Sequence, residues 1–299
     1  MVDVMHNQKL FISVSSFLGA ILIYGHVLNK VLPTEEEQKI SFSLIVLVAL
    51  SFSVPVSFFL KDVPEVVHEI TRPAFLGLML VNAWTLLRFG GPLWTPFSVY
   101  ALFLVLFHYS EYFFHCLIQP PRKDHLDSYL LNHSKAYGIA LVVGWVEYGL
   151  EVYFMPSLKS MYLPVILGVC LCTIGEILRK SAMVTAGRSF HHVVQTVKQP
   201  EHVLITWGVF SFCRHPSYLG WFLWSLGSQV ILFNPVCMVI YPIVSWQFFS
   251  SRIYHEEYTL LKFFGEGYSE YQNRVPTGLP FIAGFKQTDL RQLQHRKSN

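Results

Sequence analysis

The sequence predicts an all-α integral membrane protein, a polytopic bundle of about eight transmembrane helices. Composition is the first reason: 53% of the 299 residues are hydrophobic and 14% are charged, whereas a soluble domain carries about 25% charged residues. The second reason is that eight apolar runs approach the roughly 20 residues that a helix needs to cross the hydrocarbon core. An even number of spans places both chain ends on one side of the membrane.

The eight spans follow one another with short links. They are expected near residues 11–29, 40–60, 73–89, 96–118, 134–154, 161–178, 216–233 and 235–251. The first run lacks a strongly basic leader and is long enough to remain as a span, so we expect no cleavable signal. Paired prolines stop the helix in the longer cytosolic link 119–124. Asn234-Pro235 alone joins the last two spans, which predicts a tight helical hairpin.

The distribution of positive charge predicts the orientation. If the N-terminus is cytosolic, the lumenal loops hold only Lys30, Lys39, Arg88 and Lys159 of the 22 Lys and Arg residues. Cytosolic loops carry the excess of Lys and Arg in membrane proteins. We therefore expect both termini on the cytosolic side. The acidic run 35–37 then falls in a lumenal loop, where acids carry little topological weight.

The polar residues concentrate in the second half of the chain. Residues 1–160 are expected to form an N-terminal set of five spans, 161–285 a core of three spans with polar cytosolic segments, and 286–299 a cytosolic tail. One polar segment lies between Arg179 and Arg214, and a second follows Tyr254. The hairpin between the last two spans should bring these two segments together.

Three polar side chains that are suited to a site precede the seventh span. Arg214, His215 and Ser217 stand just before the apolar run that continues from Trp221. A soluble head group and a lipid-soluble partner can both reach such a point, which predicts a site at the membrane surface. The alternative is an interfacial anchor, because arginine and tryptophan also gather at head-group depth.

Several polar residues fall within spans, where they are costly and usually face the bundle interior. His108, Glu111 and His115 share one helix face. This face is a candidate for a metal site or a proton relay, and the alternative is an interhelical hydrogen-bond seam. We interpret three acids as interior ion pairs or packing groups: Glu147, Glu151 and Glu176.

The five cysteines indicate neither a disulfide framework nor a zinc site. Their number is odd, Cys170 and Cys172 fall on nearly opposite sides of a helix, and the sequence contains no Cys-x-x-Cys pair. We expect them to be small apolar side chains within the spans.

Arg252 and Glu256 lie one helical turn apart where the last span leaves the lipid. One interpretation is an ordinary surface pair, which stabilises a helix by a few tenths of a kcal/mol. The alternative is a divided role. The planar guanidinium of Arg252 would clamp a substrate anion, while Glu256 would hold a cationic group of a second ligand.

The chain resembles the isoprenylcysteine carboxyl methyltransferase family, and the matching motifs are densest over residues 178–285. The combination of motifs is specific, although Arg-His-Pro with a following aromatic also occurs in membrane sterol reductases and phospholipid methyltransferases. The motifs that carry the resemblance are 178–180, 185–187, 190–195, 202–205, Arg214 to Trp221, Asn234-Pro235, Arg252, Glu256-Glu257, 263–265, Tyr268 and Arg274 to Ile282.

The resemblance implies a methyltransferase of the endoplasmic reticulum membrane that takes a methyl group from S-adenosylmethionine, leaves S-adenosylhomocysteine and uses no metal. The acceptor would be the C-terminal carboxylate of a farnesyl- or geranylgeranyl-cysteine in a CaaX protein, such as a small GTPase after proteolytic trimming. Membrane lipid is an expected partner and nucleic acid is not. The core 161–285 would be the catalytic part, with its cofactor pocket on the cytosolic side.

The same resemblance assigns roles to individual residues. Arg252 and Glu256, with Arg179 less firmly, would act in catalysis, and Arg252 would bind substrate. Phe210 stands where the family has a tyrosine, which keeps an aromatic wall and loses a hydroxyl. The donor pocket would be lined by Gln195, His202, Val203, Leu204, Ile205, Phe210, His215, Pro216, Ser217, Tyr218 and Glu256.

The chemistry that the resemblance implies needs few catalytic groups. A terminal carboxylate with a pKa near 3.5 is already ionised at neutral pH, so its attack on a sulfonium methyl needs no general base. Positioning the two groups in a water-poor site would be the main requirement.

Two other classes of protein remain open. A transporter would also place acids within its spans, but transporters usually show repeat-related broken helices, and the sequence has no internal repeat. A membrane sterol reductase would share the Arg-His-Pro neighbourhood and would bind a nicotinamide cofactor instead.

Overall fold

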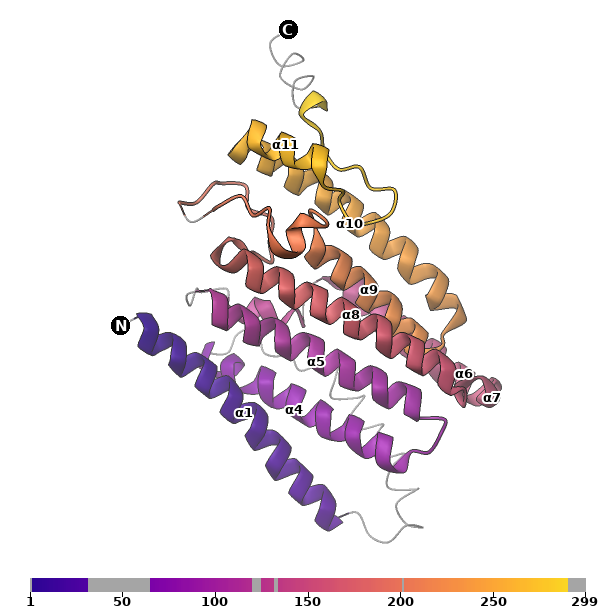
Figure 1. Cartoon of the computed structure of the whole chain (residues 1–299). Helices are drawn as coiled ribbons and strands as arrows, with labels where there is room; N and C mark the ends of the chain where they lie inside the picture. Colours follow the sequence, from indigo (N-terminus) through magenta and orange to yellow (C-terminus); the bar gives the residue numbers. More distant parts are fainter. Residues whose placement is uncertain (1, 32–64, 120–124, 132–133, 201, 290–299) are drawn as a thin grey trace. The chain divides into compact units, whose positions relative to one another are not determined.

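The protein is described by a computed structural model that covers residues 2–31, 65–119, 125–131, 134–200 and 202–289. Within these ranges the regular structure is helical (Figure 1). The α-helices are α1 (Val2–Val31), α4 (Glu65–Phe89), α5 (Thr95–Ile118), α6 (Lys135–Phe154), α7 (Pro156–Lys159), α8 (Tyr162–Ala186), α9 (Pro216–Leu232), α10 (Pro235–Phe264) and α11 (Glu266–Arg274). Short 3-10 helices are η1 (His125–Tyr129), η2 (Gly187–Ser189) and η3 (Gly208–Ser211).

The helices coincide with the predicted spans wherever the structure describes them. Five are long and apolar enough to cross a membrane: α1, α4, α5, α8 and α10. Helices α6 and α9 occupy the predicted ranges 134–154 and 216–233 as well. The expected span at 40–60 and the acidic run 35–37 lie outside the described residues. The helical fold class is confirmed, and the count of eight spans stays a prediction.

The chain separates into two compact units. One contains residues 1–170 with 227–238, and the other contains 171–226 with 239–299. The predicted division at residues 160 and 285 was drawn from composition and stays a prediction. The candidate site lies in the second unit.

The first unit has a core of aromatic and aliphatic side chains from α4, α5 and η1. Leu76, Val105, Tyr112 and Tyr129 are fully buried in it, and the rings of the two tyrosines stack with centroids 4.0 Å apart. These side chains fill the space between the helices, and polar side chains add hydrogen bonds between the same helices.

The predicted polar face of α5 is part of this packing. Nδ1 of His108 lies 2.8 Å from the Tyr129 carbonyl oxygen, and its Nε2 lies 3.0 Å from the Tyr137 hydroxyl. Both ring nitrogens are therefore engaged, which supports the hydrogen-bond seam. A different group brings metal-ligating atoms close together, namely Glu65, Glu69 and His125.

An ammonium group lies at that second cluster. Nζ of Lys9 is 3.0 Å from the Glu65 carboxylate and 3.1 Å from the Glu69 carboxylate. Glu69 and His125 are almost fully buried. The positive charge of the lysine is paired with the two acids, and we interpret the cluster as an ionic link between α1 and α4.

Acids within α6 hold the hairpin that precedes α10. The Glu147 carboxylate accepts hydrogen bonds from the backbone N–H groups of Val236 and Cys237 at 2.7 and 2.9 Å. An anion at a helix N-terminus satisfies donors that have no partner within the helix. Glu151 forms an ion pair with the buried Lys159. The tight hairpin and the interior roles of both acids were predicted correctly.

Helices α8 and α9 approach each other at glycine residues in the second unit. A Cβ atom on Gly175 would lie 2.5 Å from the carbonyl oxygen of Gly220, and a Cβ on Gly220 would lie 2.6 Å from that of Gly175. Small residues let membrane helices pack backbone to backbone. Glu176 pairs with Lys180 at 3.5 Å on α8, as the sequence predicted.

Helices α9 and α10 run antiparallel in the same unit. The hydroxyl oxygens of Ser225 and Ser245 are 3.3 Å apart, and the rings of Trp221 and Phe249 have centroids 5.8 Å apart. All five cysteines are free, and four of them are buried. The interpretation of the cysteines as structural residues is supported.

Candidate functional site

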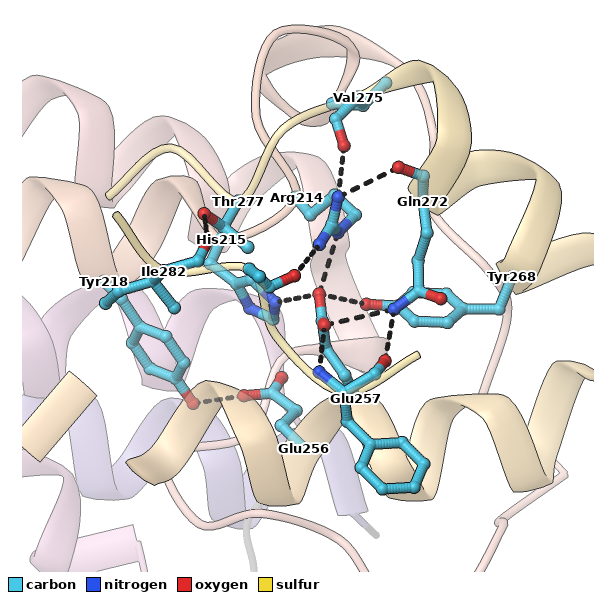
Figure 2. Close-up of polar contacts among 12 residues, drawn as sticks. Arg214, His215, Tyr218, Glu256, Glu257, Tyr268, Gln272, Val275, Thr277 and Ile282 are labelled. Carbon is cyan, nitrogen blue, oxygen red and sulfur yellow. Dashed lines mark hydrogen bonds and ion pairs between the residues drawn. The ribbon is translucent and has the colours of Figure 1, made fainter. Parts of the chain in front are cut away.

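The turn before α9 pairs with the segment after α11. The backbone N–H of Arg214 donates to the Pro276 carbonyl at 2.8 Å, and that of His215 donates to the Thr277 carbonyl at 3.1 Å. The two polar segments are thus brought together. Figure 2 shows the side chains that converge around this pairing.

Glu257 of α10 is the centre of the resulting network (Figure 2). Its side chain is completely buried, and five donors surround its two carboxylate oxygens. These are Arg214 Nε at 2.8 Å, His215 Nε2 at 3.0 Å, the Tyr268 hydroxyl at 3.1 Å, Gln272 Nε2 at 3.1 Å and the Phe285 backbone N–H at 3.0 Å.

This network fixes the polar segments to α10. Arg214 also donates to the carbonyl oxygens of Gln272, Val275 and Ala283. A buried charge is tolerated only when it is paired and hydrogen-bonded, and both conditions are met here. Burial raises the pKa of the Tyr268 phenol well above its ordinary value, so this group remains a donor to the carboxylate.

Gly284 shows how closely the chain after α11 approaches Glu257. Its φ is 77°, and a Cβ atom there would lie 1.7 Å from Glu257 Oε2. Only glycine fits such a position, because any side chain would displace the carboxylate from its donors.

Tyr218 connects Arg252 to Glu256. Its hydroxyl accepts a hydrogen bond from Arg252 Nε at 2.9 Å and donates to the Glu256 carboxylate. The ring stacks on His215 at 5.6 Å with an interplanar angle of 5°. Arg252 also donates to the His192 carbonyl. The predicted pair is therefore linked through a tyrosine and lies against the 190–195 loop.

Glu256 and Glu257 serve different environments although they are adjacent. Successive residues of an α-helix point about 100° apart. Glu256 consequently faces Tyr218 and a pocket, while Glu257 faces Arg214 and the chain after α11 (Figure 2).

An open pocket lies beside Tyr218 and Glu256. Its walls come from the loop after η2, from the start of α9 and from the end of α10. The lining residues are Ser189, His191, Val193, Val194, Gln195, His202, Val203, Tyr218, Glu256, Thr259, Leu260, Phe263 and Phe264.

The pocket gathers five of the predicted donor-binding residues, namely Gln195, His202, Val203, Tyr218 and Glu256. His202 accepts at Nδ1 from the Gln199 backbone N–H at 3.2 Å. Its proton is therefore on Nε2, which donates to His191 Nε2 at 3.0 Å. His191, Ser189, Thr259 and the two phenylalanines of the wall were not predicted to line a pocket.

The other predicted donor-binding residues do not line this pocket. Leu204 and Phe210 pack against a buried cluster of Leu261, Tyr268, Tyr271 and Phe285. Pro216 begins α9, and Ile205 is half-buried. His215 directs its Nε2 to Glu257 and reaches the pocket only through the ring of Tyr218.

Arg179 is buried and braces the start of α9. Its guanidinium donates to the Ser217 hydroxyl at 2.8 Å and lies 4.8 Å above the ring of Trp221. Ser217 accepts this bond instead of lining the pocket. The geometry supports a bracing function for Arg179, and its predicted contact with a substrate stays a prediction.

The helices and the pocket define an all-α membrane protein with an open pocket at the end of its last long helix. The sequence profile described as the isoprenylcysteine carboxyl methyltransferase (ICMT) family matches residues 166–262. A protein-S-isoprenylcysteine O-methyltransferase from Tribolium castaneum is 43% identical over 286 residues, which cover 92% of this chain and 97% of that protein. The Homo sapiens protein of the same name is 48% identical over 215 residues, covering 72% of this chain and 75% of its own length.

A solved structure agrees with these relatives. It is the eukaryotic intramembrane Ras methyltransferase ICMT, which superposes with a TM-score of 0.82 at 42% identity and covers 93% of this chain and 99% of its own. This chain belongs to the isoprenylcysteine carboxyl methyltransferase family. The resemblance found in the sequence is confirmed, and the matches favour it over the sterol reductase and the transporter.

Proposed function

We propose that this chain methylates the C-terminal carboxylate of prenylated cysteine, with S-adenosylmethionine as methyl donor. The observation that carries the proposal is the arrangement of Glu256, Tyr218 and Arg252, which puts an anion and a cation at opposite sides of one hydroxyl beside an open pocket. The reaction combines a cationic donor with an anionic acceptor, and this arrangement offers a group of opposite charge to each. The names of the relatives give the acceptor class.

The pocket residues fit the donor. When bound, S-adenosylmethionine supplies a methyl group on a cationic sulfonium. Glu256 offers a carboxylate to that charge, and Tyr218 and Phe263 add aromatic side chains to the pocket wall. Gln195 and His202 offer polar atoms at the same pocket. Of the other predicted donor-binding residues, His215 contacts this wall through the ring of Tyr218.

Arg252 would hold the acceptor carboxylate. A planar guanidinium recognises a carboxylate with two parallel hydrogen bonds, and its Nε is already oriented by Tyr218 at 2.9 Å. Because a terminal carboxylate has an ordinary pKa of about 3.3–3.7, it arrives ionised and needs no proton acceptor. The protein's task is to align the two groups and to exclude water, which lowers the barrier by several kcal/mol in comparable systems.

The membrane setting suits a lipidated acceptor. The substrates would be CaaX proteins such as small GTPases after prenylation and trimming, and the membrane would be that of the endoplasmic reticulum. The bias of Lys and Arg supports a cytosolic site with both termini on that side. Each buried CH₂ of a lipid chain is worth about 0.8 kcal/mol, so a prenyl tail favours an enzyme that receives it from the bilayer.

Two measurements on the detergent-solubilised protein test the proposal. S-adenosylhomocysteine should raise the midpoint of thermal unfolding, and NADPH should not. Labelled methyl groups should pass from S-adenosylmethionine to a farnesylcysteine analogue. Stabilisation by NADPH alone would favour the reductase, and the lack of any methyl transfer by a folded protein would exclude the proposed activity.

A further inference from the structure

The segment after α11 is an uncharged run between two cations. Residues 275–285 contain no charged side chain, and Arg274 and Lys286 border them. An apolar run of this length is too short to span a bilayer and is typical of an interfacial or re-entrant segment. Basic residues at both ends suit the head-group region.

Both ends of the run are tied to the candidate site. Pro276 and Thr277 accept the backbone hydrogen bonds of Arg214 and His215, and the Phe285 N–H donates to Glu257 at 3.0 Å. The turn between them is therefore held in one place.

The middle of the run reaches along α10 away from the site. The indole Nε1 of Trp246 donates to the Pro280 carbonyl at 2.7 Å. Trp246 precedes Arg252 by six residues, about 9 Å along the helix at 1.5 Å per residue. At this level α10 exposes large apolar side chains, namely Ile243, Val244 and Phe248. These side chains belong to a membrane-spanning candidate and indicate a lipid-facing surface.

Side chains satisfy the carbonyl groups of this turn. The Thr277 hydroxyl lies 3.3 Å from the Leu279 carbonyl oxygen and 2.7 Å from that of Ile282. The next carbonyl, that of Pro280, is bound by Trp246, and proline has no N–H to satisfy. Internal pairing of this kind is what an irregular backbone needs where water is scarce.

Phe281 is the side chain that this turn presents outward. It is 98% exposed, while Leu279 and Ile282 on either side are 4% and 8% exposed. Its φ is 61°, in the left-handed region that favours glycine, asparagine and aspartate. An aromatic residue there is strained, and in water its ring would gain no contact in return. Acyl chains would cover the ring and offset that strain.

We propose that residues 277–282 form a turn embedded in the bilayer leaflet on the side of the pocket, with the ring of Phe281 among the acyl chains. Because the turn is tied to Arg214, His215 and Glu257, it fixes the candidate site at a set depth relative to the lipid.

A spin-label experiment tests this placement in phosphatidylcholine vesicles. In a Cys170→Ala background, which leaves four buried thiols, we would label Phe281→Cys with a nitroxide and subtract the signal of the background protein. Labels at Val239→Cys on the exposed apolar face of α10 and Glu270→Cys on exposed α11 are the references. We expect position 281 to match position 239, with oxygen relaxing it strongly and a water-soluble nickel chelate weakly. A match to position 270 would overturn the proposal.

A second test uses a substitution whose effect on the unfolding midpoint depends on whether the turn faces water or lipid. Phe281→Asn relieves the left-handed strain, so if the turn faced water the variant would leave the unfolding midpoint unchanged or raise it. In lipid the amide loses apolar contact and the midpoint measured in the same vesicles should fall by several degrees. Phe281→Leu, which stays apolar, should remain close to wild type. An unchanged or raised midpoint for the asparagine variant would contradict the embedded turn.

Discussion

At the residue scale, the two adjacent glutamates of α10 have different partners and different surroundings. Glu256 lies at the pocket and accepts a hydrogen bond from Tyr218. Glu257 accepts hydrogen bonds from five donors of the surrounding chain. The sequence predicted a role for Glu256 because it follows Arg252 by one helical turn. The sequence named Glu257 only as part of the Glu256-Glu257 motif of the family resemblance and gave it no role, since its partners come from positions far away in the chain.

The proposed division of roles predicts different defects for Arg252 and Glu256. Arg252→Lys keeps the charge and loses the planar fork, so turnover should fall at least tenfold while S-adenosylhomocysteine affinity stays near wild type. Glu256→Gln should weaken donor binding together with the rate. Calorimetry and methyl transfer to a farnesylcysteine analogue measure both quantities. Wild-type kinetics in both variants would reduce the pair to a surface contact and refute the mechanism.

Glu257→Gln should destabilise the fold. The five partners of this carboxylate described above are donors, so the amide NH₂ of glutamine would face other donors and Arg214 would lose its counter-charge. Breaking one partner of a buried ion pair costs about 3–5 kcal/mol. Thermal unfolding in detergent should show a large drop, and the exposed Glu266→Gln should show none. Equal midpoints for the two variants would mean that the network contributes little.

At the element scale, close helix packing positions the site. Gly175 and Gly220 let α8 and α9 meet, which places Arg179 against Ser217 at the start of α9. Glu147 caps the N-terminus of α10, the helix that carries Arg252, Glu256 and Glu257. The helices themselves were predictable from apolar run lengths. Which glycine meets which helix was not, because the contact joins residues about 45 positions apart.

Gly220→Ala should destabilise the second unit. Its new Cβ would lie 2.6 Å from the Gly175 carbonyl oxygen and 2.8 Å from the Arg179 nitrogen, and backbone atoms cannot yield without moving a helix. Overpacking of this kind costs about 1–3 kcal/mol. Gly267→Ala on α11 is the matched control, because its Cβ would meet only Leu204 at 3.9 Å and alanine favours the helix. Thermal unfolding should move down for the first and not for the second.

At the scale of the whole molecule, the family assignment, the membrane helices and the pocket point to one activity. The proposed chemistry joins an ionised carboxylate to a sulfonium methyl and needs neither a Lewis acid nor a base. In this proposal the protein would supply alignment, opposite charges and a water-poor setting.

Metal removal should therefore leave turnover unchanged. Dialysis against a chelator, followed by the methyl-transfer assay with and without added zinc or magnesium, measures this. If activity is lost and a divalent cation restores it, the prediction fails. Within the described residues, the cluster of Glu65, Glu69 and His125 would then be the first place to examine.

The class of the protein, the positions of the helices that the structure describes, the hairpin at Asn234-Pro235 and the family could all be predicted from the sequence. These depend on run lengths, charge bias and local motifs, which a linear sequence carries directly. It also indicated the Arg252, Tyr218 and Glu256 region, because those residues lie at the ends of spans that a hairpin brings together.

Which of the predicted residues line the pocket could be identified only from the tertiary structure. His215 and Ser217 belong to the Arg-His-Pro motif, yet their side chains bind Glu257 and Arg179 instead of lining it. The direction of a side chain depends on helix rotation and on partners from distant segments, such as Thr277 and Gln272. Those contacts form when the chain folds, and no spacing within a single motif specifies them.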